Sequence, residues 1–188
     1  MRKVSVTGLN LLNSKEVKTL AKIISNSKFS SLEVLYIHGA REIGFGKYSE
    51  IFLDLLKKSS VQVFIDSFQL SEKDIKLIFE HSIKAKSLCL VNCEVANITS
   101  GFKISGKKFS LKTLDLFWTC IQDDKKFLSE AKTTNLFKAL KGSKISSSLQ
   151  AIHISAEDFD KNDIEDLQES YLPNVKLGLD DKSPEPMK

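Results

Sequence analysis

One short apolar pattern recurs along the chain of 188 residues, and this recurrence constrains the fold more than any other feature. Its clearest copy is the segment 111–121, LKTLDLFWTCI, which has the form L-x-x-L-x-L-x-x-T-x-I. Leu114 and Leu116 alternate as in a β-strand with one apolar side. A turn and a helix-like segment follow. Self-similarity at a period of this size is typical of repeat proteins.

Seven segments carry the strand part of the pattern. Their first strand positions are Val4, Leu35, Val63, Leu88, Leu114, Ile152 and Val175, with spacings of 31, 28, 25, 26, 38 and 23 residues. No single unit can bury its own apolar strand and helix stripe, whereas stacked units can. The sequence therefore predicts an α/β protein with one curved parallel sheet and helices on its outer side.

Local signals place several of the connecting segments. Asn13 with Glu16, and Ser71 with Asp74, have the spacing of residues that cap the first turn of a helix. The other connecting segments of note are two expected helices, 48–58 and 124–141, and an expected loop, 101–108.

The apolar cores of four units share the form L-x-L-x-x-(C/T/A/F)-x-aliphatic. These cores are Leu35/Ile37/Ala40/Ile43, Val63/Ile65/Phe68/Leu70, Leu88/Leu90/Cys93/Val95 and Leu114/Leu116/Thr119/Ile121. They resemble the leucine-rich repeat family, in particular the longer helical type seen in ribonuclease inhibitor, although only Cys93 has the residue that the family favours at its position. The resemblance runs from Val4 to Leu179. It implies a solenoid of six to seven degenerate repeats that recognises proteins on its concave sheet face, usually without catalysis. Residues 1–179 would form this domain, and 180–188, with two prolines and alternating charges, a disordered tail.

The residues between the inward aliphatics are expected to line the concave face. One row reads Ser5, Tyr36, Phe64, Cys89, Asp115, His153 and Lys176, and the next includes His38, Asp66, Val91 and Phe117. Clustered aromatic side chains on an exposed face are typical of a partner site. The alternative is that another part of the protein covers them. The predicted protein-binding residues are Tyr36, His38, Phe64, Asp66, Asp115, Phe117, Trp118 and His153.

Charge suggests two further functions. The net charge of +4 is mild, but residues 151–188 hold ten acids against four lysines, so the remainder of the chain carries +10. The stretch Lys84–Lys112 has six lysines and one glutamate, which makes an adaptor for RNA or an anionic surface an alternative function. A regulator of a small GTPase is another alternative, since some proteins similar to ribonuclease inhibitor have that role. Arg2 and Arg41 would then be the only candidates for an arginine finger.

Other sequence features bear on compartment and cofactors. No apolar run approaches the roughly 18 residues that span a bilayer, and the N-terminus lacks an apolar signal region. Three cysteines suggest reduced thiols in an intracellular, cytoplasmic protein. Gly101 and Gly106 lack the following Ser or Thr of a phosphate loop, and we expect neither a cofactor nor a metal. The outer strands of such an array leave backbone groups unpaired, which favours a subunit of a larger complex or a piece of a longer repeat protein.

Overall fold

The computed structural model describes residues 3–9, 12–26, 32–40, 43–95, 98–106, 108–117, 130–155 and 161–180. Its centre is one parallel sheet of seven strands, which lie side by side in the order in which they occur in the chain. They are β1 (Lys3–Val6), β2 (Leu32–His38), β3 (Ser59–Asp66), β5 (Ser87–Val91), β7 (Thr113–Phe117), β8 (Ala151–Ser155) and β9 (Lys176–Asp180). The predicted α/β class and parallel sheet are confirmed.

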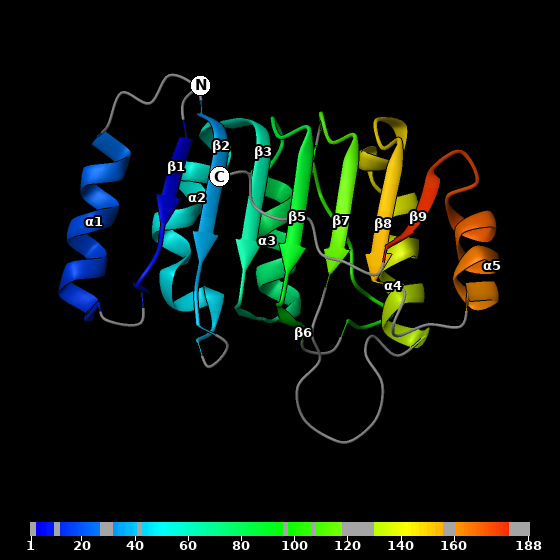
Figure 1. Ribbon diagram of the computed structural model, residues 1–188, viewed down its shortest axis with the longest axis horizontal. Coiled ribbons are helices and arrows are strands. Elements are labelled where there is room, and N and C mark those ends of the chain that lie inside the picture. The colour runs from blue at the N-terminus through cyan, green and yellow to red at the C-terminus, as the bar shows by residue number, and fades with distance from the viewer. Residues whose placement is uncertain are drawn as a thin grey trace.

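The helices of the described residues connect these strands. They are α1 (Ser14–Asn26), α2 (Ser49–Lys58), α3 (Glu72–His81), α4 (Glu130–Lys141) and α5 (Lys161–Tyr171), with 3-10 turns at Phe45–Tyr48 and Lys144–Ser147. In Figure 1, α2, α3 and α4 lie behind the sheet, while α1 and α5 flank its two ends. The main apolar core lies between the sheet and these helices. The opposite face of the sheet, here called the helix-free face, carries no helix from the described part of the chain.

Both predicted capping pairs are present. The backbone N–H of Asn13 donates to Glu16 Oε2 at 2.7 Å, and the N–H of Glu16 donates to Asn13 Oδ1 at 3.1 Å. Ser71 and Asp74 exchange the same two bonds at the start of α3. Each pair satisfies two backbone donors that a helix start leaves without a partner in the helix.

The strand register confirms the alignment predicted for the first six units. Val4 pairs with Leu35, and the line of register partners continues through Val63, Leu88 and Leu114 to Ile152. The last position is wrong, because Ile152 pairs with Leu177 and not with Val175. Val175 is buried in the turn before β9, where its N–H donates to Leu172 O at 2.9 Å.

The segment between β5 and β7 contains no helix within residues 98–106 and 108–112. Phe102, Ile104, Phe109 and Leu111 are buried there and fill the core beside the sheet as a helix stripe would. The predicted loop is therefore confirmed except at residue 107, which lies outside the described residues. The predicted helix 48–58 is confirmed as α2, and that at 124–141 from Glu130 onward; 124–129 lie outside the described residues.

Two short strands, β4 (Gln69–Leu70) and β6 (Glu94–Val95), pair in parallel beyond the ends of β3 and β5. A single tight turn separates each of them from the main strand before it. At these turns Ser67 and Asn92 adopt positive φ angles of 60° and 50°. Asparagine tolerates this conformation better than most residues because its short polar side chain can hydrogen-bond locally. These two turns build the site described next.

Candidate functional site

The helix-free face carries the two rows of side chains that the sequence predicts. In the first row, register pairs link Tyr36 to Phe64, Phe64 to Cys89, Cys89 to Asp115 and Asp115 to His153. This row ends at Gly178 and not at the expected Lys176, because of the shift in β9. The second row runs from His38 through Asp66 and Val91 to Phe117.

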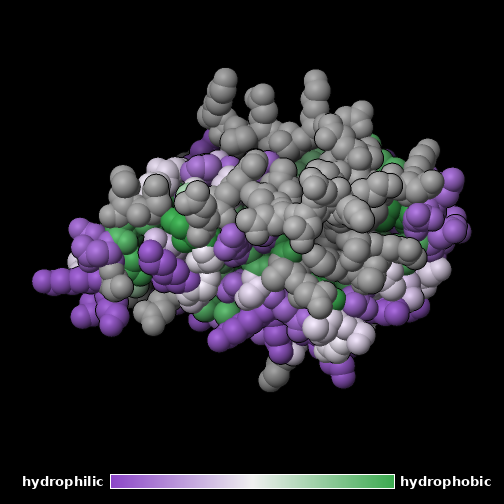
Figure 2. Space-filling view, turned by 90° about the horizontal axis from the view of Figure 1, so that it is seen from below, coloured by the Kyte–Doolittle hydropathy of each residue, from purple (hydrophilic) through white to green (hydrophobic). Residues whose placement is uncertain are grey.

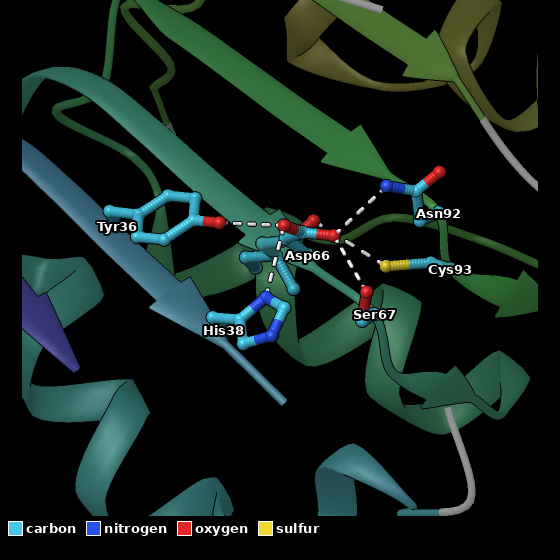
Figure 3. Close-up of polar contacts among 7 residues, drawn as sticks. Tyr36, His38, Asp66, Ser67, Asn92 and Cys93 are labelled. Carbon is cyan, nitrogen blue, oxygen red and sulfur yellow. Dashed lines mark hydrogen bonds and ion pairs between the residues drawn. The ribbon is translucent and has the colours of Figure 1, made fainter. Parts of the chain in front are cut away.

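Asp66, at the end of β3, is the centre of a cluster of hydrogen bonds (Figure 3). Tyr36 Oη donates to its Oδ2 at 2.6 Å, and His38 Nδ1 lies 3.1 Å from the same oxygen. Ser67 Oγ and Asn92 Nδ2 donate to Oδ1 at 2.8 and 3.3 Å. A carboxylate has about four acceptor positions, and these donors fill them. Asp66 therefore orients its neighbours and is not a free ligand for a partner.

The turns after β3 and β5 bring Ser67 and Asn92 to Asp66. Their backbone N–H groups donate to Val91 O at 3.0 Å and to Phe117 O at 2.7 Å, so each turn is tied to the next strand. Neither residue is among the binding residues that the sequence predicts. The signal that could have found them is a serine or asparagine directly after a predicted strand, where a turn often needs a positive φ.

The cluster fixes the protonation of its acid and its phenol. Burial raises the pKa of the Asp66 carboxyl, but the hydrogen bonds from Tyr36, Ser67, His38 and Asn92 outweigh it and hold that pKa below its usual value. Burial, the bond to Asp66 and the repulsion from its charge raise the pKa of Tyr36. At neutral pH the cluster is thus an ionised carboxylate that accepts from a neutral phenol.

A second acid–histidine pair lies at the other side of the same face. His153 Nδ1 on β8 lies 2.6 Å from Asp115 Oδ1 on β7. The backbone of Gly178 passes beneath the ring, and a Cβ at that position would come within 2.3 Å of His153 Cδ2. A carboxylate accepts only from a protonated nitrogen, so in the neutral form both His38 and His153 carry the proton on Nδ1. Nε2 is then the acceptor nitrogen of each ring.

A small apolar cluster lies between the two pairs. It consists of Val34, Phe64, Cys89, Val91 and Phe117, with Tyr36 packed against it. Phe64 and Phe117 are each only 6% exposed, whereas the side chains of His38 and His153 are 41% and 33% exposed. Of the predicted binding residues, the two phenylalanines are therefore nearly buried, whereas the two histidines and the half-buried Tyr36 offer surface. Trp118 lies outside the described residues.

The structure also bears on the lysine-rich stretch, the cysteines, a possible metal site and a possible membrane span. Among residues 84–112, the described lysines are exposed, and Lys86 and Lys112 are neighbours because the N–H of Lys112 donates to Lys86 O at 2.8 Å.

Burial raises the pKa of Cys93 to about 12 and also raises the pKa of Cys89, so both thiols are neutral at neutral pH. In the described part of the chain, no three His, Cys, Asp or Glu residues gather into a possible metal site. None of its helices combines the length and the apolar character needed to cross a bilayer.

A comparison with models of protein families found no match, and a comparison with curated proteins found no significant match either. The helix-free face itself therefore carries the evidence on function.

Proposed function

We propose that this protein is a non-catalytic protein-binding module, a leucine-rich-repeat solenoid of the ribonuclease-inhibitor-like type, whose partner binds the helix-free face. The observation that carries the proposal is the pair of partly exposed histidines on this face, each held by a carboxylate. Strands in chain order with a helix after most of them support the solenoid, because stacked repeats give this order.

The separation of the two histidines favours a protein partner. His38 lies on β2 and His153 on β8, and the strand order places four strand spacings between them. At about 4.8 Å for each spacing, the rings are roughly 19 Å apart across the sheet. A small molecule cannot contact both rings, whereas a protein surface can.

The chemistry of the face also restricts the partner. In the neutral rings the two Nε2 atoms accept hydrogen bonds, and the carboxylates of Asp66 and Asp115 behind them make the local potential negative. A partner segment that presents N–H donors, such as arginine or lysine side chains, fits this arrangement. The carboxylates contribute by holding the histidine rings in place.

The test is affinity capture of partners from the source cell with matched variants. The double variant His38→Ala/His153→Ala should lose a partner that wild type recovers. His81→Ala is the control, because His81 lies on α3, on the other side of the sheet. A double variant that recovers the same partners at the same yield contradicts the proposal.

Histidine variants make a sharper test than aromatic ones. Phe117 is almost fully buried, and replacing such a ring with alanine costs about 3–5 kcal/mol in stability, so a loss of binding could reflect unfolding. The same experiment also tests the adaptor for RNA or anionic surfaces. If Lys86→Glu/Lys112→Glu loses the partner and the histidine variant keeps it, the basic stretch is the binding site.

A further inference from the structure

The two outer strands of the sheet expose the same kinds of groups at their open edges. Among the described strands, β1 pairs only with β2, and β9 pairs only with β8. Val4 and Val6 on β1, and Leu177 and Leu179 on β9, pack against the core but are only partly buried. Each edge therefore combines outward backbone groups with aliphatic side chains that another strand could cover.

The two ends carry opposite charges. Elements β1 and α1 together hold four lysines and one glutamate, a net charge of +3. Elements α5 and β9 together hold five acids and two lysines, a net charge of −3. The hydrophilic side chains at both ends of the molecule are visible in Figure 2. The ends of two copies are thus complementary, whereas like ends repel.

The acidic end also has an open groove. It has a volume of about 600 Å³ and is lined by Glu165, Gln168, Glu169, Leu177 and Leu179. Leucines of the edge strand form one side and acids of α5 the other. An element that combines aliphatic and basic side chains fits this groove. Helix α1 has that composition, with Lys15, Lys18 and Lys22 on its exposed side and Ile23 60% exposed.

We propose that the basic end of one copy, β1 and α1, docks on the acidic end of a second copy, β9 and α5. The pairing of Val4 with Leu177 would continue the line of register partners across the interface. The direction of the strands supports head-to-tail contact, because all seven are parallel and a copy placed end to end keeps that direction. A two-fold axis would instead join like ends, basic to basic or acidic to acidic. A head-to-tail contact of this kind builds rings or open chains.

Charge-reversal variants test the contact. One variant is Lys15→Glu/Lys18→Glu and the other is Glu165→Lys/Glu169→Lys. Acids near a helix start and bases near a helix end suit the helix dipole, so Lys15→Glu and Glu169→Lys should not destabilise their helices. Circular dichroism checks that both variants remain folded. The control is Lys108→Glu/Lys112→Glu, which lowers the net charge by the same amount as Lys15→Glu/Lys18→Glu, at exposed positions away from both ends.

The readout is sedimentation velocity from low micromolar to near-millimolar protein, at low and high salt. Wild type and control should associate as concentration rises, and salt should weaken the association. Each reversal variant alone should associate about tenfold more weakly or worse. An equimolar mixture of the two should recover the association, because each variant then meets an end of opposite charge. A wild type that stays monomeric throughout, or a mixture that stays as weak as its components, overturns the proposal.

Discussion

The hydrogen bond from Tyr36 to Asp66 should contribute measurably to the free energy of unfolding. A double-mutant cycle of Tyr36→Phe, Asp66→Ala and the combination isolates this pair, since Phe keeps the ring and removes only the hydroxyl. The donor–acceptor distance of 2.6 Å is that of a short bond to a charged acceptor. We expect the two single changes to be strongly non-additive.

The magnitude follows from the burial of the two groups. Hydrogen bonds to charged groups contribute about 1.5–3 kcal/mol. The Asp66 side chain is 14% exposed and Tyr36 is only half-buried, so water competes in part and the lower half of that range applies. The expected coupling free energy is about 1.5–2 kcal/mol, which is roughly 10- to 30-fold in the folding equilibrium.

Urea denaturation at neutral pH measures the four free energies of unfolding. A coupling below about 0.5 kcal/mol, the limit within which independent sites are additive, would refute the reasoning. Tyr171→Phe on α5 is the control for the loss of a phenol hydroxyl and should change stability by less than about 0.5 kcal/mol.

The pH dependence of this coupling has a definite sign. The pKa of Asp66 in the folded protein lies below its ordinary value of 3.8, so folding favours the ionised carboxylate. The contribution is complete above that ordinary value and disappears as the pH falls through the lower pKa of the folded state. The cycle repeated under acid conditions should therefore give a smaller coupling than at neutral pH.

Three further predictions concern the glycine beneath His153, the two histidine rings and the cap of α3. Gly178→Ala should displace the ring of His153 and lower the free energy of unfolding by about 1–3 kcal/mol in urea denaturation. Gly101→Ala, where the added Cβ would make only an ordinary contact of 3.9 Å with Thr99 Oγ1, should change it by less than about 0.5 kcal/mol. Long-range proton–nitrogen NMR should find the neutral rings of His38 and His153 protonated on Nδ1; protonation on Nε2 would contradict the acid–histidine bonds. Ser71→Ala removes the cap of α3 and should cost about 1 kcal/mol by the same denaturation assay, and no loss would mean that the cap is not formed in solution.

The sheet could be predicted from the sequence because strands are marked by a local, periodic alternation of aliphatic residues. Alternating aliphatics placed six strands in register, from Val4 to Ile152. The same rule fails at β9, where Val175 is as apolar as a strand residue but is buried in a turn. A hydrophobic pattern reports burial, and it cannot distinguish a buried turn residue from a strand residue two positions away.

The site was predictable only in part, for a different reason. Alternation within strands places Asp115 beside His153 and His38 beside Asp66, and the register shows both pairs. The roles of Ser67 and Asn92 depend on positive φ angles, which no apolar pattern encodes. The apolar pattern also cannot predict how deeply Phe64 is buried, because its burial depends on packing across the sheet.

The wide separation of the two acid–histidine pairs makes the proposed binding mode quantitatively testable. Sites roughly 19 Å apart should contribute independently to a binding free energy. If one continuous partner surface spans the face, His38→Ala and His153→Ala should each weaken binding, and their effects should add in the double variant. If the partner contacts only one pair, one single variant should match the double and the other should match wild type. The sum of the single effects therefore distinguishes a partner that spans the sheet from one that occupies one side of it.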